Sequence, residues 1–369
     1  MHKICLLPGD GIGPEVMCEA LKVLQTVAVA HGLQLECEEG LIGGDGIDYA
    51  GSPLPDATLE LARASDAVLL AAVGGPKWDS TDPEATRPEQ GLFALRAGLG
   101  TYANIRPVRL LPELADACPL RDAGPDDIDL VIVRELTGGI YFGAKGRECD
   151  VEGAAGDCAG RAAFDACDYF EHEIARVARC AFELARTRRG QVCSVDKANV
   201  LETSRLWREV VCEVAADYPD VELSHLRADA AAARLVSDPA GFDVVLTDNL
   251  FGDILSDEAG VLTGSLGMLS SASFGAGPAL YEPVHGSAPD IAGYGIANPL
   301  AMIDCVAWMF EASFSLPGPA REIRAAVRRV LAEGWRTRDL CTLDTPAERI
   351  VDCAGMGDLV CAVLAGMSR

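Results

Sequence analysis

Residues 244–258 read Val-Val-Leu-Thr-Asp-Asn-Leu-Phe-Gly-Asp-Ile-Leu-Ser-Asp-Glu, a short apolar run followed at once by a segment with paired aspartates. The run Val244–Thr247 predicts a buried strand. Asp253 and Asp257 are four residues apart, so a helix would place both carboxylates on one face, where they repel unless a cation lies between them. Ligands that are all oxygen suit Mg²⁺ or Mn²⁺ rather than zinc. Asp229 is a third candidate ligand, and an acidic surface face is the alternative interpretation.

The same alternation of strand and helix patterns continues on both sides of this stretch. Apolar runs predict strands at 3–8, 67–73, 128–134 and 191–195, and amphipathic patterns predict helices from Pro14 to Gly32, near 55–64 and at about 170–186. The segment 147–163, rich in glycine, alanine and acidic residues, is the least helix-like and is a candidate excursion from the main body. The alternation indicates an α/β fold.

Length and composition are those of a folded protein of two domains. A chain of 369 residues exceeds the size at which a single core usually stops growing. Its composition, 49% hydrophobic and 24% charged, is ordinary for a globular protein. No apolar run approaches the length that spans a bilayer, and glycines and an aspartate interrupt the first apolar stretch, unlike a secretory signal. We therefore expect a soluble, cytoplasmic protein.

Charge and cysteine content exclude several kinds of partner. A formal net charge of −25 argues against binding to nucleic acid or to an anionic membrane, because both require a basic face. The 14 cysteines are scattered, and none forms a Cys-x-x-Cys pair, so we interpret them as free, mostly buried thiols rather than disulfides or zinc ligands.

The glycine-rich turn at 9–13 follows the first predicted strand, as a dinucleotide-binding loop would. The fingerprint of a Rossmann domain requires Gly-x-Gly-x-x-Gly, and here Pro14 occupies the third required position. The turn therefore predicts a tight connection from strand to helix and does not identify a cofactor.

Three arginines stand in or beside predicted elements between residues 96 and 134. Arg96 lies on an apparent helix at 91–97, Arg106 precedes a proline in an extended segment, and Arg134 ends a strand. Guanidinium groups bind carboxylates through a two-pronged fork, so three of them would hold a dicarboxylate in one orientation. Solvated surface arginines are the alternative.

Tyr141 and Lys197 are the candidate acid and base. Tyr141 lies in the glycine-rich turn at 137–143, just after Arg134, where a phenol beside fixed positive charge is a plausible proton donor. Lys197 is one of only five lysines and directly follows a strand end; a lysine near cations or a metal can titrate low enough to act as a base. An aromatic residue in such a turn more often serves packing.

Taken together, the motifs resemble the β-decarboxylating dehydrogenase family, which contains isocitrate and 3-isopropylmalate dehydrogenases. The resemblance covers nearly the whole chain in ordered blocks at 7–15, 74–78, 87–91, 103–107, 134–141, 196–200, 249–257, 282–293 and 295–299. It implies a two-domain isocitrate/isopropylmalate dehydrogenase-like α/β fold with a shared mixed sheet, not a Rossmann fold. Residues 1–101 and 264–369 would form a discontinuous cofactor-binding domain, and residues 102–263 the substrate and dimerisation domain.

The resemblance also implies NAD as the cofactor. A carboxylate at Asp290 can accept both ribose hydroxyls of NAD and would repel the extra phosphate of NADP. The implied cofactor-binding residues are Gly75, His285, Gly286, Ser287, Ala288, Asp290, Ile291 and Asn298.

Carried over residue by residue, the resemblance assigns roles to the candidates above. Arg96, Arg106 and Arg134 match the arginines that bind the substrate's carboxylates, and Asp229, Asp253 and Asp257 match the ligands of a Mg²⁺ or Mn²⁺ ion, with Asp229 also near the substrate. Lys197 matches the base and Tyr141 the acid. In the family, Lys197 and Asp229 would reach the site from a partner subunit, which implies a homodimer with two shared active sites.

Fewer residues point to the substrate. Family members that act on isopropylmalate place a glutamate and two apolar residues before the first arginine, here Glu89, Leu92 and Phe93, and Val200 would complete this pocket from the other subunit. An apolar wall admits a branched alkyl group and leaves a third carboxylate unpaired. Phe93, where leucine is usual, and Asp248, where a small residue is more common, depart from the pattern.

We therefore expect oxidative decarboxylation of 3-isopropylmalate to 4-methyl-2-oxopentanoate, a step of leucine biosynthesis. An NAD-dependent dehydrogenase of D-malate, tartrate or homoisocitrate would share nearly every motif. A non-catalytic regulatory subunit is a remoter alternative, since it would be expected to lack metal or base residues that are present here.

Overall fold

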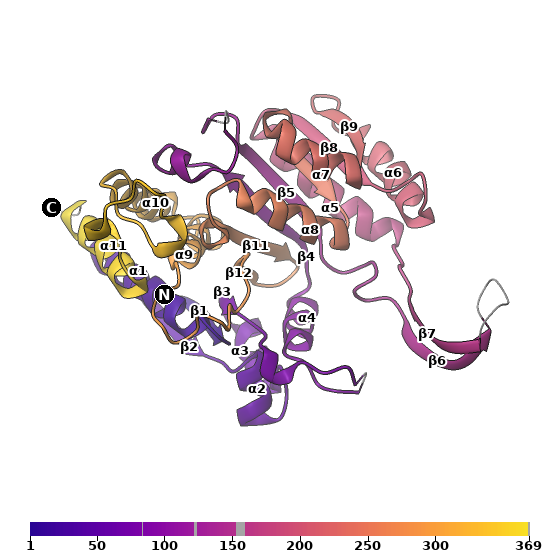
Figure 1. Ribbon diagram of the computed structural model, residues 1–369, viewed down its shortest axis with the longest axis horizontal. Coiled ribbons are helices and arrows are strands. Elements are labelled where there is room, and N and C mark those ends of the chain that lie inside the picture. The colour runs from indigo at the N-terminus through magenta and orange to yellow at the C-terminus, as the bar shows by residue number, and fades with distance from the viewer. Residues whose placement is uncertain (83, 122–123, 153–158, 368–369) are drawn as a thin grey trace.

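A ten-stranded mixed sheet runs through the whole protein (Figure 1). The computed structural model describes residues 1–369 except 83, 122–123, 153–158 and 368–369. In spatial order the strands are β2 (Leu35–Glu39), β1 (His2–Gly9), β3 (Ala67–Ala72), β12 (Ala279–Pro283), β11 (Ser270–Gly275), β4 (Thr101–Arg109), β5 (Asp129–Glu135), β10 (Val244–Thr247), β8 (Gln191–Asp196) and β9 (Glu222–Arg227).

The direction of the strands changes at the centre of this sheet. β2, β1, β3 and β12 are parallel to one another, and so are β5, β10, β8 and β9. Between these two blocks, β11 pairs antiparallel with β12 and with β4, and β4 pairs antiparallel with β5. The mixed sheet and the absence of a uniform parallel order confirm the predicted α/β class without a Rossmann arrangement.

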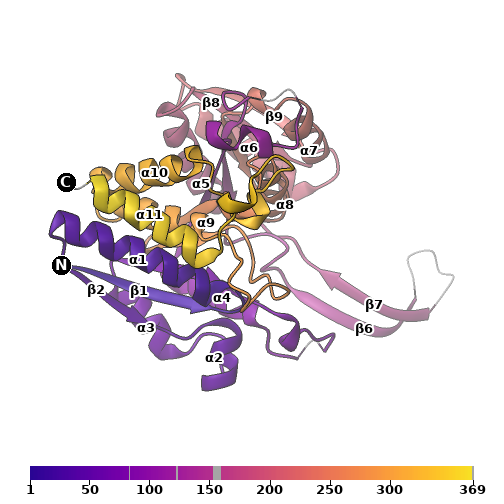
Figure 2. The same cartoon turned by 60° about the vertical axis from the view of Figure 1, so that its left-hand side comes forward.

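Eleven helices are described, and they cover both faces of the sheet. They are α1 (Gly13–His31), α2 (Gly43–Ala50), α3 (Asp56–Ala64), α4 (Pro88–Leu99), α5 (Glu171–Arg186), α6 (Glu202–Ala215), α7 (Ala228–Ser237), α8 (Asn249–Val261), α9 (Leu300–Ala312), α10 (Pro317–Ala332) and α11 (Cys353–Met367). One face carries α1, α9, α10 and α11 together with α7 and α8, and the other carries α2 to α4 and, further along, α5 and α6 (Figures 1 and 2).

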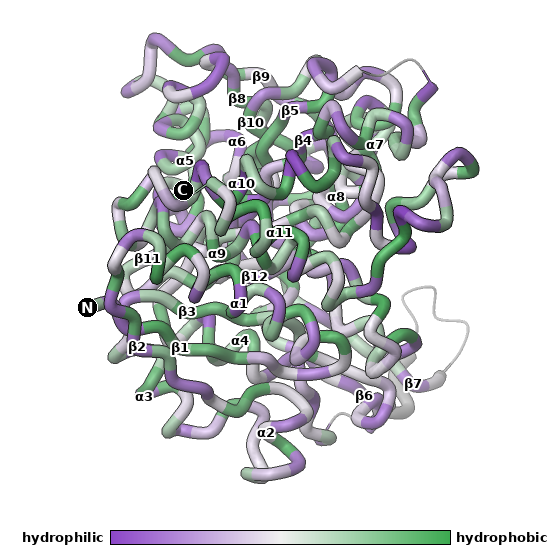
Figure 3. The backbone as a smooth tube through the Cα atoms, turned by 90° about the vertical axis from the view of Figure 1, so that its left-hand side faces the viewer, coloured by the Kyte–Doolittle hydropathy of each residue, from purple (hydrophilic) through white to green (hydrophobic). Residues whose placement is uncertain are grey.

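The inner strands of the two blocks are buried on both faces, as covered parallel strands are, whereas the edge strands β2 and β9 are largely exposed. In β1, Ile4 and Leu6 pack against one layer of helices, and the alternating Cys5 and Leu7 pack against the other. Figure 3 shows the hydrophobic residues that follow β1 and β3 through the interior. This two-sided burial explains why these strands are continuous apolar runs in the sequence and do not alternate between apolar and polar residues.

Helix ends follow the local chemistry that the sequence contains. α1 has a proline in its first turn with Glu15 beside it, and it ends at Gly32, whose φ of 63° is a left-handed conformation that glycine adopts without strain. The predicted apolar face of α5, which includes Ile174, Val177 and Phe182, is buried. Strand and helix boundaries in these regions agree with the sequence prediction to within one or two residues.

A two-stranded ribbon projects from the body of the protein (Figures 1 and 2). β6 (Lys145–Glu152) and β7 (Ala159–Asp165) pair antiparallel and belong to a separate sheet. The ribbon accounts for most of the segment 147–163, and the excursion predicted there is confirmed for the residues that the structure describes. Among all residues that the structure describes, no helix is both long and apolar enough to cross a membrane.

Candidate active site

A cavity of about 240 Å³ brings together most of the predicted substrate residues. It lies beside the central strands, between α4 and α8. Its lining includes Glu89, Leu92, Phe93, Arg96, Arg106, Arg134, Tyr141, Asp253, Glu282, His285 and Gly286. Ten of these eleven were predicted from separate stretches of sequence to act together as substrate, metal, catalytic or cofactor residues, and Glu282 is the exception.

The three arginines are buried, not solvated. Arg96 on α4, Arg106 on β4 and Arg134 on β5 have 6%, 5% and 2% of their surface exposed. Burial lowers the pKa of Arg106, and burial together with the neighbouring Arg106 charge lowers the pKa of Arg134 to about 10. The guanidinium groups give the cavity positive walls that attract anions.

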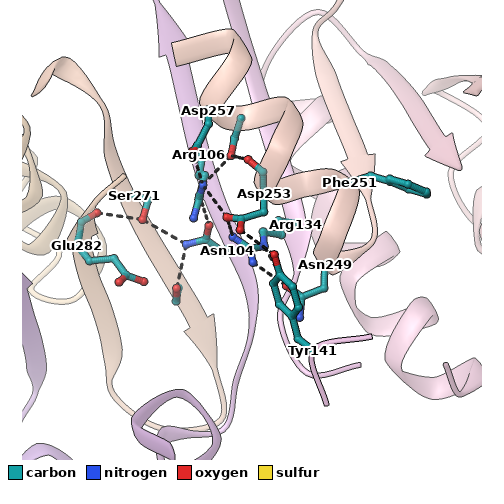
Figure 4. Close-up of polar contacts among 12 residues, drawn as sticks. Asn104, Arg106, Arg134, Tyr141, Asn249, Phe251, Asp253, Asp257, Ser271 and Glu282 are labelled. Carbon is teal, nitrogen blue, oxygen red and sulfur yellow. Dashed lines mark hydrogen bonds and ion pairs between the residues drawn. The ribbon is translucent and has the colours of Figure 1, made fainter. Parts of the chain in front are cut away.

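Neutral side chains fix two of these guanidinium groups (Figure 4). Arg106 Nε donates to Asn104 Oδ1 at 2.7 Å, and its Nη1 donates to Ser256 Oγ at 2.6 Å. Arg134 donates from Nε and Nη2 to Asn249 Oδ1, at 3.0 and 2.8 Å. Arg96 instead pairs with a carboxylate, Glu282 Oε1, at 2.6 Å.

The aspartate pair on α8 faces the same arginines. Asp253 forms an ion pair with Arg134 and lies 3.5 Å from Arg106 Nη1, and Asp257 Oδ1 lies 3.4 Å from the same nitrogen. Burial raises the pKa of Asp253, but the two arginines outweigh it and lower the pKa below its ordinary value. At Asp257 burial dominates and raises the pKa. Two hard oxygen donors one turn apart, both within 3.5 Å of Arg106 Nη1, fit a small divalent cation.

Tyr141 contacts this aspartate pair directly. Its hydroxyl donates to Asp253 Oδ2 at 2.9 Å, and its ring lies 5.6 Å from the Arg134 guanidinium carbon. Burial and the Asp253 charge raise the pKa of Tyr141 to about 12, so the phenol holds its proton at neutral pH and can donate it. The turn that carries it is tight because Gly138 and Gly139 pack against Tyr169, where a Cβ atom would collide with the ring.

Lys197 and Asp229 lie together but away from this cavity. They form a hydrogen-bonded ion pair in which the Asp229 side chain is 67% exposed. Val200, three residues after Lys197, is 62% exposed. Accordingly, no group of three or more His, Cys, Asp or Glu side chains among the described residues is arranged to hold a metal ion.

The predicted cofactor loop borders the cavity at His285 and Gly286. His285 Nδ1 donates to the Gly286 carbonyl at 2.9 Å, and burial lowers the histidine pKa, so the ring is neutral. The first glycine-rich turn supports this loop, because Ile12 N donates to the Ser287 carbonyl at 2.8 Å and Gly11 leaves no room there for a Cβ atom. Asp290 is exposed, whereas Asn298 is buried and donates to Asp339 at 3.0 Å.

Comparison with known proteins identifies the family. A model of the isocitrate/isopropylmalate dehydrogenase family matches residues 3–360. The chain belongs to this family. A curated relative from Nitratidesulfovibrio vulgaris, named 3-isopropylmalate dehydrogenase, is 57% identical over 363 residues, which cover 98% of this chain and 99% of the relative. Another of the same name, from Synechococcus elongatus, is 53% identical and covers 98% of this chain and 97% of its own length.

Solved structures of the family have the same fold. Isocitrate dehydrogenase from Methylococcus capsulatus superposes with a TM-score of 0.84 at 36% identity, covering 99% of this chain and all of that one. A β-decarboxylating dehydrogenase from Thermococcus kodakarensis gives a TM-score of 0.77 at 35% identity, with 100% and 97% coverage. The isocitrate/isopropylmalate dehydrogenase-like fold predicted from the sequence is therefore confirmed.

The structure also gives a role to Asp248, which departs from the family pattern and had no role predicted from the sequence. Asp248 caps the N-terminus of α8, because its Oδ1 accepts from Phe251 N at 2.8 Å. Burial raises the pKa of this carboxyl to about 7. The helix that presents Asp253 and Asp257 thus begins at a buried cap whose charge depends on pH.

We predict that Asp248→Asn stabilises the protein at alkaline pH. The folded pKa lies above the unfolded one, so the wild type loses stability as pH rises between about 4 and 7. Asparagine keeps the cap without the buried charge, and the variant should gain a few kcal/mol at most above pH 7. Urea unfolding at pH 5 and pH 8 tests this; an equal effect at both pH values would contradict it.

Proposed function

We propose that the protein is an NAD⁺-dependent, divalent-metal-dependent dehydrogenase that converts 3-isopropylmalate to 4-methyl-2-oxopentanoate and CO₂ in leucine biosynthesis. The observation that carries this proposal is the convergence of three buried arginines, an aspartate pair and a protonated tyrosine on one cavity with an apolar wall. The names of the curated relatives support the same activity.

The arginines account for recognition of a diacid. A 2-hydroxy diacid carries two carboxylates, and guanidinium forks at fixed positions bind both and set the orientation of the carbon between them. Because the cavity excludes most of the solvent around Arg106 and Arg134, these contacts are stronger than they would be on the surface. A monocarboxylate would leave buried positive charge unpaired.

Asp253 and Asp257, with Asp229 of the partner subunit, would hold Mg²⁺ or Mn²⁺. Such an ion supplies the positive charge that acidifies the 2-hydroxyl and makes the later 2-oxo group an electron sink, while NAD⁺ supplies the hydride acceptor. Lys197 takes the hydroxyl proton as hydride leaves C2. After loss of the β-carboxylate as CO₂, Tyr141 delivers a proton to C3 of the enolate.

We propose a homodimer with shared active sites. The position of Lys197, Asp229 and Val200 supports it, because these residues do not line the cavity of their own chain. Exposed apolar side chains support a partner on this side: Val236 on α7 and Ile254 and Val261 on α8 are about half exposed. We assign residues 1–101 and 264–369 to the cofactor-binding domain and 102–263 to the domain that dimerises, with a cleft between them that closes on substrate.

NAD⁺ is the proposed cofactor because Asp290 is an exposed carboxylate on the loop that follows His285. The loop Gly286–Ile291, His285, Asn298 and Gly75 would surround the adenosine and nicotinamide halves. We propose the cytoplasm as the site of action, since the twelve cysteines that the structure records are all free thiols, as is usual in a reducing compartment.

A smaller 2-hydroxy diacid, such as D-malate or tartrate, is the second candidate substrate, and Phe93 is the observation that favours it. The Phe93 ring lines the cavity, with its centroid 5.6 Å from that of Phe142, edge-on, and 6.1 Å from that of Tyr141. It leaves less room in the cavity than the leucine that is usual at this position.

The test of the proposed function is NADH formation by the purified protein with Mg²⁺ or Mn²⁺. We expect 3-isopropylmalate to be oxidised in preference to D-malate, tartrate, isocitrate and homoisocitrate, with activity abolished by a chelator and absent with NADP⁺. Preference for another diacid would contradict the assignment of the substrate. A folded protein that oxidises none of them would contradict the enzyme assignment and favour a regulatory subunit.

We also predict that Phe93→Leu widens the substrate range. Removal of the ring enlarges the pocket, so kcat/KM for 3-alkylmalates with longer branches should rise relative to 3-isopropylmalate by roughly tenfold, the effect of one or two methylene groups in an apolar pocket. Steady-state kinetics with a series of alkyl lengths measures this. An unchanged ranking across the series would show that Phe93 does not limit the pocket.

A further inference from the structure

Asparagine is scarce in this chain, and every copy lies in a segment of the active-site motifs. The 369 residues include 56 aspartates and glutamates but only four asparagines, Asn104, Asn199, Asn249 and Asn298. Two of the four, Asn104 and Asn249, are at most 1% exposed and accept hydrogen bonds from the buried arginines. We therefore ask why these two positions carry an amide and not a carboxylate, which is far more frequent in this chain.

Asn104 lies at the centre of the sheet, directly opposite Ser273 on β11 and Arg134 on β5. Its Oδ1 accepts from Arg106 Nε at 2.7 Å, and its Nδ2 donates to the hydroxyls of Ser273 and Ser271 at 2.9 and 3.2 Å. Ser271 in turn donates to the Glu282 carbonyl at 2.9 Å. The amide is therefore fully satisfied and holds the Arg106 fork in one plane (Figure 4).

Asn249 holds Arg134 in the same way and also reaches the turn that carries Tyr141. Its Oδ1 accepts twice from Arg134, at 3.0 and 2.8 Å, and its Nδ2 donates to the Gly138 carbonyl at 3.2 Å. Its backbone N donates to Tyr169 Oη at 2.9 Å. One amide thus ties a substrate arginine to the backbone three residues before Tyr141.

A carboxylate has nearly the shape of this amide and would form a stronger bond with either guanidinium. It would also cancel one positive charge. Arg96 already pairs with a carboxylate, Glu282, whereas the side chains that accept from Nε of Arg106 and Arg134 are neutral amides. A divalent ion at Asp253 and Asp257 would take up the two aspartates that now face these arginines. The positive charges of Arg106 and Arg134 then match the two carboxylates of a diacid.

We propose that Asn104 and Asn249 are positioning residues that fix the Arg106 and Arg134 guanidinium groups through neutral acceptors, so that both charges remain available to the two carboxylates of the substrate. This inference rests on the proposed function for the nature of the substrate. An amide at these two positions should therefore bind the diacid more tightly than a carboxylate of the same shape.

Asn104→Asp is the decisive variant. The Ser273 hydroxyl has no other recorded partner and can reverse to donate to the new oxygen, so the fold and the melting temperature should stay close to the wild type. The KM for the diacid should rise by roughly tenfold to a hundredfold, the effect of losing one charge-assisted hydrogen bond, while the KM for NAD⁺ stays unchanged. Asn249→Asp should act in the same direction but also lose stability, because Gly138 loses its donor.

Two further variants separate charge from shape. Gln25→Glu makes the same change of amide to acid on the exposed surface of α1 and should alter neither KM. Asn104→Ala removes the acceptor without adding charge and should lower the melting temperature as well as weaken the substrate. If the amide were needed only for packing and hydrogen bonding, Asn104→Asp would be harmless and at least as stable as the wild type.

Calorimetric binding of succinate in saturating Mg²⁺ keeps the test independent of turnover. Succinate is a dicarboxylate without a hydroxyl to oxidise, and we expect its affinity to fall by the same factor in Asn104→Asp and to be unchanged in Gln25→Glu. If the wild type oxidises no diacid but binds succinate, and Asn104→Asp binds it more weakly, the proposed function is refuted and this inference stands. Equal affinities of wild type and Asn104→Asp, or no binding by the wild type, would overturn the inference.

Discussion

The buried positive charge of Arg106 and Arg134 is the constraint on which the centre of the structure depends. Charged groups removed from water are tolerated only when their donors are satisfied, and removal of one partner leaves an expensive unpaired charge. The central strands β4, β5 and β11 therefore carry polar side chains on the face that turns toward α8. Strands further out, such as β1 and β3, carry apolar side chains there. Asn104, Ser256, Asn249 and the α8 aspartates complete this shell.

The topology of the sheet explains why this polar layer lies where it does. Two blocks of parallel strands run in opposite directions and meet at β11 and β4, where antiparallel pairing places Asn104 opposite both Ser273 and Arg134. Helices from the two ends of the chain cover one block, and helices from its middle cover the other (Figure 1). The cavity lies between these two groups of elements, so side chains from distant segments reach it without strain.

Sequence patterns predicted those features that depend on neighbours along the chain. The strand at 244–247, the helix from Pro14 to Gly32 and the shared face of Asp253 and Asp257 are local consequences of periodicity and end chemistry. The role of Asn249 was not predicted because its contact with Arg134 spans 115 residues of sequence. Asn104 lies only two residues from Arg106, but the serines that orient its amide are more than 100 residues away. Asp248 became interpretable only as a helix cap, and the position of Lys197 and Asp229 outside the cavity lining became visible only in the folded chain.

We propose that the arginines and the α8 aspartates form one site for a diacid and a divalent ion. In the structure Asp253 forms an ion pair with Arg134, so an ion bound by the aspartates should free the arginine to bind the substrate. Calorimetric binding of 3-isopropylmalate, without NAD⁺, at increasing Mg²⁺ and constant ionic strength measures this coupling. We expect the affinity for 3-isopropylmalate to rise with Mg²⁺, and 3-isopropylmalate to tighten Mg²⁺ binding by the same factor. Affinities that are independent of each other would contradict it.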